Sequence, residues 1–368
     1  MALMNKQVVL VRRPNGIPKR TDFNIIETVV PSLKEGEVLL KTKYFSLDPY
    51  MRPRMNSTKG SYIECFKLGV PLDGAAVCVV EESRHQKLKV GDIVLSEAGW
   101  QTYAVSSDRV SEGMSLNLGS LTKLSDEVKI SYYLGVLGMP GLTAHYGLLD
   151  IGRPQAGETV VVAAATGPVG SMVGQLAKLK GCRVVGIAGG TEKCDYAMRE
   201  FGFDACVDYK RKSFAKDLKK ACPNKIDIYF ENVGGSVFKT VLRFLNNFAR
   251  VPVCGLITYY NDGSTLQEPG FNLASGYAKL QALWRMFFHF DQTPMVMSSI
   301  LGKRLKFQGF IISDHFDQYA SFLKESIPLI QSGKIKVKED IVKGIENSPD
   351  AFIRLLQGKN FGKLLVEI

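Results

Sequence analysis

Short stretches of alternating apolar and polar residues, separated by turn residues, run through the first third of the chain. Several short strands with glycine- or proline-containing turns between them are typical of a small, mostly antiparallel β unit. We therefore expect this part to lack strands that are connected by helices. The clearest strand segments are residues 7–11, 37–42, 75–80 and 92–95.

From about residue 133 the pattern changes to apolar strands that alternate with helical segments. Residues 158–165 end in a continuous apolar run, as expected of a strand whose two faces are covered by helices. Apolar residues at helical spacing follow up to Leu179. Further strands are expected at residues 182–188, 205–209, 226–230, 249–254 and 306–312. Such alternation predicts an α/β fold with a doubly wound parallel sheet.

The last part of the chain returns to the pattern of the first. It contains a helical segment near residues 349–356 and a strand segment at 363–368. We therefore predict a β-rich domain made of residues 1–132 and 313–368, and a parallel-sheet domain made of residues 133–312.

A glycine-rich turn lies between the first apolar strand and its helix. Gly167 and Gly170 would let the backbone approach a pyrophosphate at the helix start, where the helix dipole favours negative charge. Gly174 would allow the helix to pack closely on its neighbours. An ordinary strand-to-helix turn is the alternative. Because strand, glycines, helix and second strand follow within about 30 residues, the pattern predicts dinucleotide binding.

The end of the second strand indicates which dinucleotide is bound. An NAD site usually has an acid there, whereas this chain has Gly189-Gly190-Thr191-Glu192-Lys193. The small residues leave room for a 2′-phosphate, Lys193 can pair with it, and Tyr209 can hold the phosphate or the adenine edge. The alternative is that Lys193 is a solvated surface residue. Glu192 is an acid in this segment, which disfavours NADP. The prediction is NADPH/NADP.

Charge and cysteine content limit the other classes of protein. The 47 basic and 36 acidic residues give a net charge of +11, but the basic residues are scattered, so we expect a solvated surface and no nucleic-acid partner. No apolar run approaches the length of a membrane-spanning helix, and the N-terminus does not resemble a secretory signal. Seven dispersed cysteines without a CxxC pair predict reduced thiols and a cytoplasmic location.

The histidines and cysteines do not predict a metal site. The four histidines lie far from any cysteine in sequence, whereas a zinc alcohol dehydrogenase needs a compact set of Cys, His and Glu ligands. No GxSxG nucleophile motif is present either. We expect no metal and no nucleophilic catalysis.

Five sequence motifs are distinctive in combination. They are LDPYMR at 47–52, GMPGLTA at 138–144, GQLAKLKGC at 174–182, DIYFENVGG at 227–235 and CGLITYYN at 254–261. Together they resemble the zinc-independent medium-chain dehydrogenases/reductases, and most of all the group of prostaglandin reductase, leukotriene 12-hydroxydehydrogenase and alkenal double-bond reductase. The resemblance spans nearly the whole chain, and it implies a GroES-like catalytic domain beside a Rossmann domain, and a homodimer.

The resemblance also implies a set of cofactor-binding residues. The 2′-phosphate lysine falls on Lys193 and the adenosine-side tyrosine on Tyr209. The pyrophosphate turn and the remaining positions fall on Gly167, Pro168, Val169, Gly170, Asn232, Cys254, Gly255, Ile257, Tyr260, Phe310, Ile311, Ile312 and Asn360.

The activity that the resemblance implies is reduction of the carbon–carbon double bond in an α,β-unsaturated aldehyde or ketone, a small-molecule enone or alkenal. NADPH would give a hydride to the β-carbon, and the enolate charge that develops on the carbonyl oxygen needs hydrogen-bond donors. Tyr260 is the first candidate, acting directly or through the cofactor ribose. Tyr50 is the second, with a core role as its alternative.

Two features depart from the family pattern. Glu231 stands where Asp is usual. Residues 261–306 are longer than expected and suggest either a packed or dimer-contact helix or a lid over the substrate pocket. Their apolar residues at near-helical spacing are Tyr277, Leu280, Leu283, Trp284, Met286, Phe287 and Phe290.

Three alternative functions remain beside the enone reductase. They are a quinone reductase with the same cofactor site, an NADPH-occupied regulatory protein without turnover, and an alcohol dehydrogenase without zinc, which the missing ligands disfavour. The natural substrate stays open, as does the question whether Arg52 or Arg54 meets a substrate carboxylate.

Overall fold

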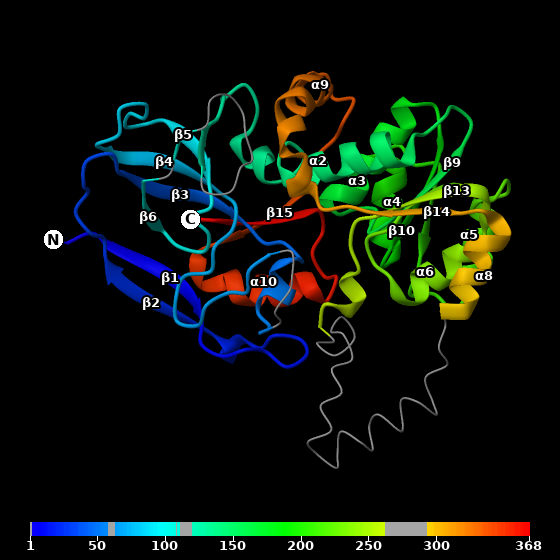
Figure 1. Cartoon of the computed structure of the whole chain (residues 1–368), viewed down its shortest axis with the longest axis horizontal. Helices are drawn as coiled ribbons and strands as arrows, with labels where there is room; N and C mark the ends of the chain where they lie inside the picture. The colour runs from blue at the N-terminus through cyan, green and yellow to red at the C-terminus, as the bar shows by residue number, and fades with distance from the viewer. Residues whose placement is uncertain (1, 58–62, 108, 111–119, 262–292) are drawn as a thin grey trace, which may run out of the picture.

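Two β-sheets make up the two halves of the molecule in a computed structural model of the chain (Figure 1). The C-terminal segment returns to the half that contains the N-terminus, so α10 and β15 lie beside the first strands (Figure 1). The structure describes residues 2–57, 63–107, 109–110, 120–261 and 293–368.

The first half is built on an eight-stranded sheet with the order β15-β16-β3-β4-β5-β8-β7, in which β6 also pairs with β3. Its neighbours are antiparallel except for β15 with β16 and β7 with β8. A separate antiparallel hairpin, β1 with β2, packs beside it. The strands are β1 (Met4–Leu10), β2 (Phe23–Val29), β3 (Val38–Ser46), β4 (Ala76–Ser83), β5 (Ile93–Ser96), β6 (Tyr103–Ser106), β7 (Arg109–Val110), β8 (Ser120–Lys123), β15 (Glu339–Lys343) and β16 (Lys363–Glu367).

The second half is a six-stranded sheet with the order β11-β10-β9-β12-β13-β14, and every pair in it is parallel. This is the predicted doubly wound sheet, so the predicted α/β fold class is confirmed. The strand order reverses between β9 and β12, which is where ligands bind in such sheets. The strands are β9 (Thr159–Ala163), β10 (Arg183–Ala188), β11 (Ala205–Asp208), β12 (Ile226–Phe230), β13 (Leu245–Val253) and β14 (Lys306–Gly309).

Helices follow the parallel strands and connect the two halves. None of the described helices is long and apolar enough to cross a membrane. The helices are α1 (Met51–Arg54), α2 (Met139–Tyr146), α3 (Pro168–Leu179), α4 (Thr191–Arg199), α5 (Phe214–Ala221), α6 (Gly235–Leu242), α8 (Thr293–Lys303), α9 (Tyr319–Gln331) and α10 (Ser348–Leu356). The short helical turns are η1 (Arg20–Asp22), η2 (Ile130–Leu134), η3 (Gly147–Gly152), η4 (Ile257–Tyr259), η5 (Ile312–Gln318) and η6 (Ile345–Asn347).

One hydrophobic core joins the two sheets. It contains Val77 and Leu95 of the first sheet, Val160 and Phe230 of the second, and Leu365 of the C-terminal strand. Burial of apolar area stabilises such a core by roughly 25 cal/mol per Å². The two halves are therefore packed through a shared core at the side where the cleft lies.

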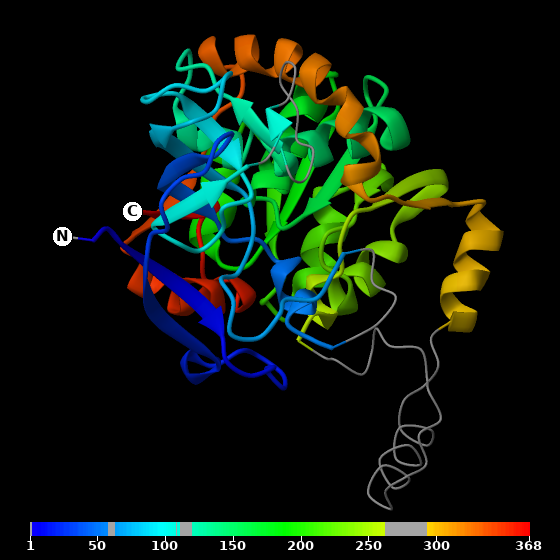
Figure 2. The same cartoon turned by 60° about the vertical axis from the view of Figure 1, so that its left-hand side comes forward.

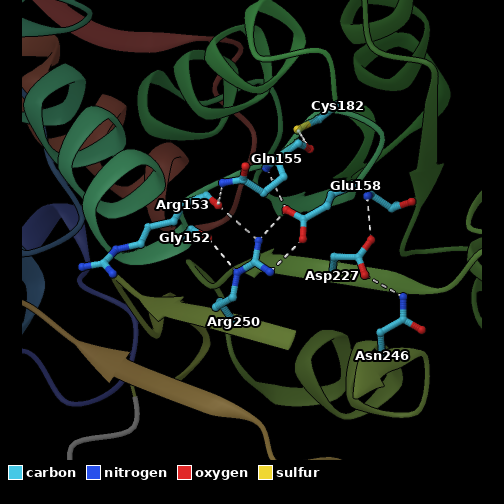
Figure 3. A network of polar contacts seen from close by, with 9 residues as sticks. Gly152, Arg153, Gln155, Glu158, Cys182, Asp227, Asn246 and Arg250 are labelled. Carbon is cyan, nitrogen blue, oxygen red and sulfur yellow. Dashed lines mark hydrogen bonds and ion pairs between the residues drawn. The ribbon is translucent and has the colours of Figure 1, made fainter. Parts of the chain in front are cut away.

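A polar network joins the amino-terminal ends of the central strands of the parallel sheet, away from the cleft (Figure 3). Arg250 on β13 binds the Glu158 carboxylate with both terminal nitrogens, at 2.8 and 2.5 Å. Asp227 on β12 accepts from the Thr159 backbone N–H and from the Asn246 amide. Burial alone would raise the pKa of Glu158, but the hydrogen bonds from Arg250 and Gln155 lower it.

A buried ion pair joins the C-terminal strand to the first sheet. Lys363 Nζ lies 2.5 Å from Asp48 Oδ1, 2.5 Å from Ser46 Oγ and 3.5 Å from the Leu47 carbonyl oxygen, and Ser46 also binds Asp48. Lys363 is 2% exposed. A lysine ammonium has three N–H groups, and all three have an acceptor here.

The structure corrects several sequence-based strand assignments. The last parallel strand ends at Gly309 rather than at Ile312, because its partner β13 ends at Val253, the residue paired with Gly309. Strands β2 and β15 were not predicted. The domain boundaries at 132/133 and 312/313 stay a prediction, and the apolar residues 277–290 lie outside the described residues.

Replacing Lys363 with Met is expected to lower the free energy of unfolding by about 3–5 kcal/mol, because it leaves the Asp48 carboxylate buried without its cation. The control is Lys343→Met, since the Lys343 side chain is 86% exposed and 4.0 Å from Glu367. Denaturant titration measures both. A loss of under 1 kcal/mol for Lys363→Met would contradict the assigned role of the pair.

Candidate active site

A cleft of about 680 Å³ lies between the two halves. It begins at the glycine-rich turn after β9, passes the ends of β10 and β12, and continues to Tyr50 and Leu95 of the first sheet. Every residue that the sequence motifs assign to the cofactor and to catalysis lines this cleft. Their individual roles stay predictions.

The glycine-rich turn has no room for a side chain at Gly170. A Cβ on Gly170 would lie 2.3 Å from the Ala164 carbonyl oxygen, and Ala164 itself has a positive φ of 54°. Helix α3 begins at Pro168, and the N–H groups of a first helical turn lack partners within the helix. Gly174 is required for packing, because its Cβ would lie 1.9 Å from the Phe203 ring. The turn thus offers N–H groups to an anion in the cleft.

Lys193 and Tyr209 meet at one end of the cleft, called here the adenosine end. Lys193 Nζ donates to the Gly358 carbonyl oxygen at 2.8 Å. The Tyr209 hydroxyl lies 3.1 Å from the position that a Cβ on Gly189 would take. Asn360 is next along the wall and donates to the Gly362 carbonyl oxygen.

A second lysine, which the sequence motifs did not indicate, lies beside Lys193. The Lys210 side chain covers Gly189, with its Cε 3.0 Å from a Cβ built there. Burial and then the Lys210 charge lower the pKa of Lys193. Two ammonium groups that repel each other are relieved by an anion between them. From the sequence, the basic residues in general are expected on a solvated surface, and Lys210 lies in the turn before α5.

Asn232 lies at the point where the strand order reverses. Its side-chain amide donates to the Ala163 carbonyl oxygen at 2.9 Å and so bridges the ends of β12 and β9. Glu231 before it is 1% exposed and does not line the cleft. Its Oε1 accepts from the Val233 and Gly234 N–H groups at 2.6 and 2.9 Å.

The loop from Cys254 to Tyr260 forms the facing wall. The Tyr260 hydroxyl oxygen accepts from the Leu256 N–H at 3.3 Å and lies 3.1 Å from a Cβ built on Gly255. Cys254 lines the cleft with a half-buried side chain. Burial and then the charge of Glu231 raise the pKa of Cys254 to about 12.

Tyr50 faces the cleft from the first half of the molecule, where it directly precedes α1. A Cβ on Gly74 would lie 4.0 Å from its hydroxyl. Burial, and then the charges of Glu97 and Asp48, raise the pKa of Tyr50 well above its ordinary value. The phenol therefore keeps its proton, and can donate a hydrogen bond, throughout the neutral range.

Arg52 and Arg54 both serve the fold and do not line the cleft. Arg52 donates to the Gly16 carbonyl oxygen at 2.8 Å and to Asn56 at 2.7 Å. Arg54 binds Asp73 and lies over the Phe66 ring at 4.0 Å. These contacts occupy both guanidinium groups.

Residues 310–312 leave the parallel sheet and turn into the cleft. Phe310 packs against Tyr146 and Phe230 at centroid distances of 5.6 and 6.4 Å. In the part of the chain that the structure describes, no group of three or more His, Cys, Asp or Glu residues is placed to hold a metal ion.

Comparisons with known proteins agree with this geometry. Residues 6–113 match the family described as "N-terminal domain of oxidoreductase", and residues 168–326 match the family described as "Zinc-binding dehydrogenase". The NADPH-dependent curcumin reductase of Escherichia coli is 47% identical, over 99% of this chain and 97% of its own. The chain belongs to the zinc-independent medium-chain dehydrogenase/reductase family. The family prediction made from the motifs is therefore confirmed.

Two further relatives support membership in this reductase family. The 2-alkenal reductase (NADP(+)-dependent) of Nicotiana tabacum is 38% identical, over 99% of this chain and 97% of its own. The crystal structure of CurA from Vibrio vulnificus in complex with NADPH is 48% identical, with a TM-score of 0.85 and 98% of each chain covered.

Alkylation of Cys254 by iodoacetamide is expected to be very slow at pH 8, although the residue lines the cleft. A pKa of about 12 leaves roughly one thiol in ten thousand ionised at that pH. Because the pKa is raised, labelling should increase about tenfold per pH unit as the pH rises towards 12. Peptide mass spectrometry measures it, with the unfolded chain as the control. Rapid labelling of the folded protein at pH 8 would show that the thiol is not protected.

Proposed function

We propose that this reductase reduces the carbon–carbon double bond of α,β-unsaturated aldehydes or ketones with NADPH. The observation that carries the proposal is one continuous cleft that joins an anion-binding helix start to two tyrosine hydroxyl groups from different halves of the molecule. The related curcumin reductase is described as NADPH-dependent, and the related 2-alkenal reductase is described as NADP(+)-dependent. The related CurA was crystallised with NADPH. The predicted cofactor and reaction class agree with these relatives.

The residues of the cleft fit this cofactor. The glycine-rich turn offers the backbone N–H groups of a helix start to a pyrophosphate, and its close fold depends on Gly170, where a Cβ would collide with the Ala164 carbonyl oxygen. Lys193, Tyr209 and Lys210 surround the end of β10, where a 2′-phosphate is to be distinguished from a hydroxyl. Asn232, the Cys254–Tyr260 loop and residues 310–312 would hold the nicotinamide side.

When bound, NADPH supplies the hydride for the β-carbon of the substrate. The chain's own task is to orient the enone and to stabilise the negative charge that develops on its carbonyl oxygen. Tyr260 is proposed to donate to that oxygen. Its own oxygen accepts from the Leu256 N–H, and an accepted hydrogen bond strengthens the phenol as a donor. Tyr50 is proposed to orient the enone from the other wall.

Tyr260→Phe is expected to lower kcat about 10–100-fold, because one donor to the developing oxyanion is lost. The dissociation constant of NADPH should change less than threefold, since the ring remains. Steady-state assays of NADPH oxidation with several enones and calorimetry measure the two effects. Unchanged kcat with every enone would remove Tyr260 from the proposed role.

Lys193→Ala is expected to weaken NADPH binding about 10–100-fold, the range of a lost charge-assisted hydrogen bond. NADH binding should change less than threefold, since that cofactor carries no 2′-phosphate. Calorimetry measures both constants. The control is Lys216→Ala, which removes an exposed lysine of α5 outside the cleft. Equal losses for NADPH and NADH would contradict selection by Lys193.

The assay that tests the function compares an alkenal, an enone and a simple quinone with NADPH in a metal-free buffer. Faster turnover of the alkenal or enone supports the proposed function, and faster turnover of the quinone supports the alternative. NADPH binding without any turnover would favour the regulatory alternative.

A homodimer and a cytoplasmic location are proposed as well. Strand β14 is at the end of the parallel sheet, and the nearby α8 lies at the periphery of the molecule (Figure 2). Met297 and Leu301 of α8 are 56% and 80% exposed. Exposed apolar side chains beside an edge strand favour pairing with a second copy. Sedimentation velocity distinguishes the monomer from the homodimer. No disulfide links any two of the seven cysteines, all of which lie among the described residues, and this is usual in a reducing compartment.

A further inference from the structure

Two loops meet on the nicotinamide side of the cleft and are joined by backbone hydrogen bonds. The first is the turn of residues 231–235 after β12, and the second is the loop of residues 254–260 after β13. The Ile257 N–H donates to the Asn232 carbonyl oxygen at 3.4 Å, and the Thr258 N–H donates to that of Val233 at 3.1 Å. The two loops therefore cannot move independently.

Tyr259 fastens the same two loops through its side chain. Its hydroxyl accepts from the Gly235 N–H at 3.2 Å. A Cβ on Gly234 would lie 2.8 Å from the Tyr259 ring. Gly234 and Gly235 both have positive φ, 78° and 59°, which L side chains rarely adopt. The two glycines adopt this conformation without strain, and it directs the Gly234 and Gly235 N–H groups to the Glu231 carboxyl and the Tyr259 hydroxyl.

Glu231 holds both loops through hydrogen bonds of its backbone and of its side chain. Its backbone carbonyl oxygen accepts from the Cys254 and Gly255 N–H groups at 2.9 and 3.1 Å, which ties it to the second loop. Its side-chain Oε1 accepts from the Val233 and Gly234 N–H groups, which shapes the first. One residue thus contacts both loops without lining the cleft itself.

Burial of the Glu231 carboxyl costs free energy of folding. The residue is 1% exposed, and its Oε2 has no hydrogen-bond partner among the described residues. Burial raises its pKa, against the effect of the hydrogen bonds from the turn and from the Tyr229 hydroxyl. A buried carboxyl that is kept at such a cost is explained by the geometry it imposes.

We propose that Glu231 is a positioning residue that sets Asn232 and the 254–260 loop as one unit for the nicotinamide half of the cofactor. It acts as an acceptor of the turn N–H groups, and its charge is secondary. The proposal rests on the proposed function for the identity of the cofactor.

A pair of variants of equal size separates acceptor from charge. Glu231→Gln keeps an oxygen for the Val233 and Gly234 N–H groups, whereas Glu231→Met fills the same space without an acceptor. The dissociation constant of NADPH, measured by calorimetry without substrate, is expected to rise less than threefold for Gln and about tenfold for Met. Equal constants for Met and wild type, or equal losses for Gln and Met, overturn the proposal.

A double-mutant cycle shows whether Glu231 acts through Asn232. Glu231→Met should weaken NADPH binding little further when Asn232→Ala is already present, because the positioned group is gone. Additive losses would mean that Glu231 has only a general structural role. The control is Glu158→Ala, which removes a part-buried carboxyl at the amino-terminal ends of the parallel strands (Figure 3). It should leave the dissociation constant of NADPH unchanged.

Tyr259→Phe provides a second test if Glu231→Met does not fold, since it removes only one hydroxyl from the same two loops. It is expected to weaken NADPH binding about threefold and to be coupled with Asn232→Ala, and additive losses contradict the proposal. Failure of the proposed function is recognised separately. In that case the wild type reduces no enone, while the calorimetric comparison still decides the role of Glu231.

Discussion

The ion pair between Lys363 and Asp48 is the constraint on which the rest of this structure depends. The two residues are 315 positions apart and almost fully buried, so neither charge can be solvated if the other is removed. The pair fixes β16 beside β3. Its acid, Asp48, directly precedes the turn that carries Tyr50. Its base, Lys363, follows the Gly358–Gly362 loop, which contacts Lys193 and lines the adenosine end. One buried contact therefore holds both ends of the cleft in register.

The shared core explains why the cleft is a fixed space. Side chains from both sheets and from the C-terminal strand pack in one cluster, so the wall with Tyr50 and the wall with Tyr260 are mounted on a common support. Close packing of this kind transmits small displacements instead of absorbing them. The polar network around Arg250 ties the parallel sheet together at the amino-terminal ends of its central strands, away from the cleft.

Local sequence patterns predicted the parallel sheet and the glycine-rich turn, because each depends on neighbours within a few residues. Most of the residues that line the cleft were instead implied by the resemblance of the motifs to the reductase family. Local patterns did not indicate Lys210, Glu231 as a support or the Lys363–Asp48 pair. The residues around Lys210 in the sequence do not differ from those of any basic turn. Only the folded structure, in which the Lys210 side chain lies over Gly189, shows that it is close to Lys193. The pairing of Lys363 depends on which strands become neighbours, and no local period encodes that. Strand β14 ended early for the same reason, since its length is set by β13.

The surroundings of the two tyrosines decide how their roles divide. Burial, and then the negative charges of Glu97 and Asp48, keep the Tyr50 phenol protonated, and the same charges oppose negative charge on a substrate oxygen beside it. Tyr260 instead accepts a backbone N–H, a dipole whose positive end favours a developing oxyanion nearby. In the proposed mechanism, stabilisation of the enolate is therefore assigned mainly to Tyr260. Tyr50 suits the ground state better, where it can orient an uncharged carbonyl with a proton that it does not give up.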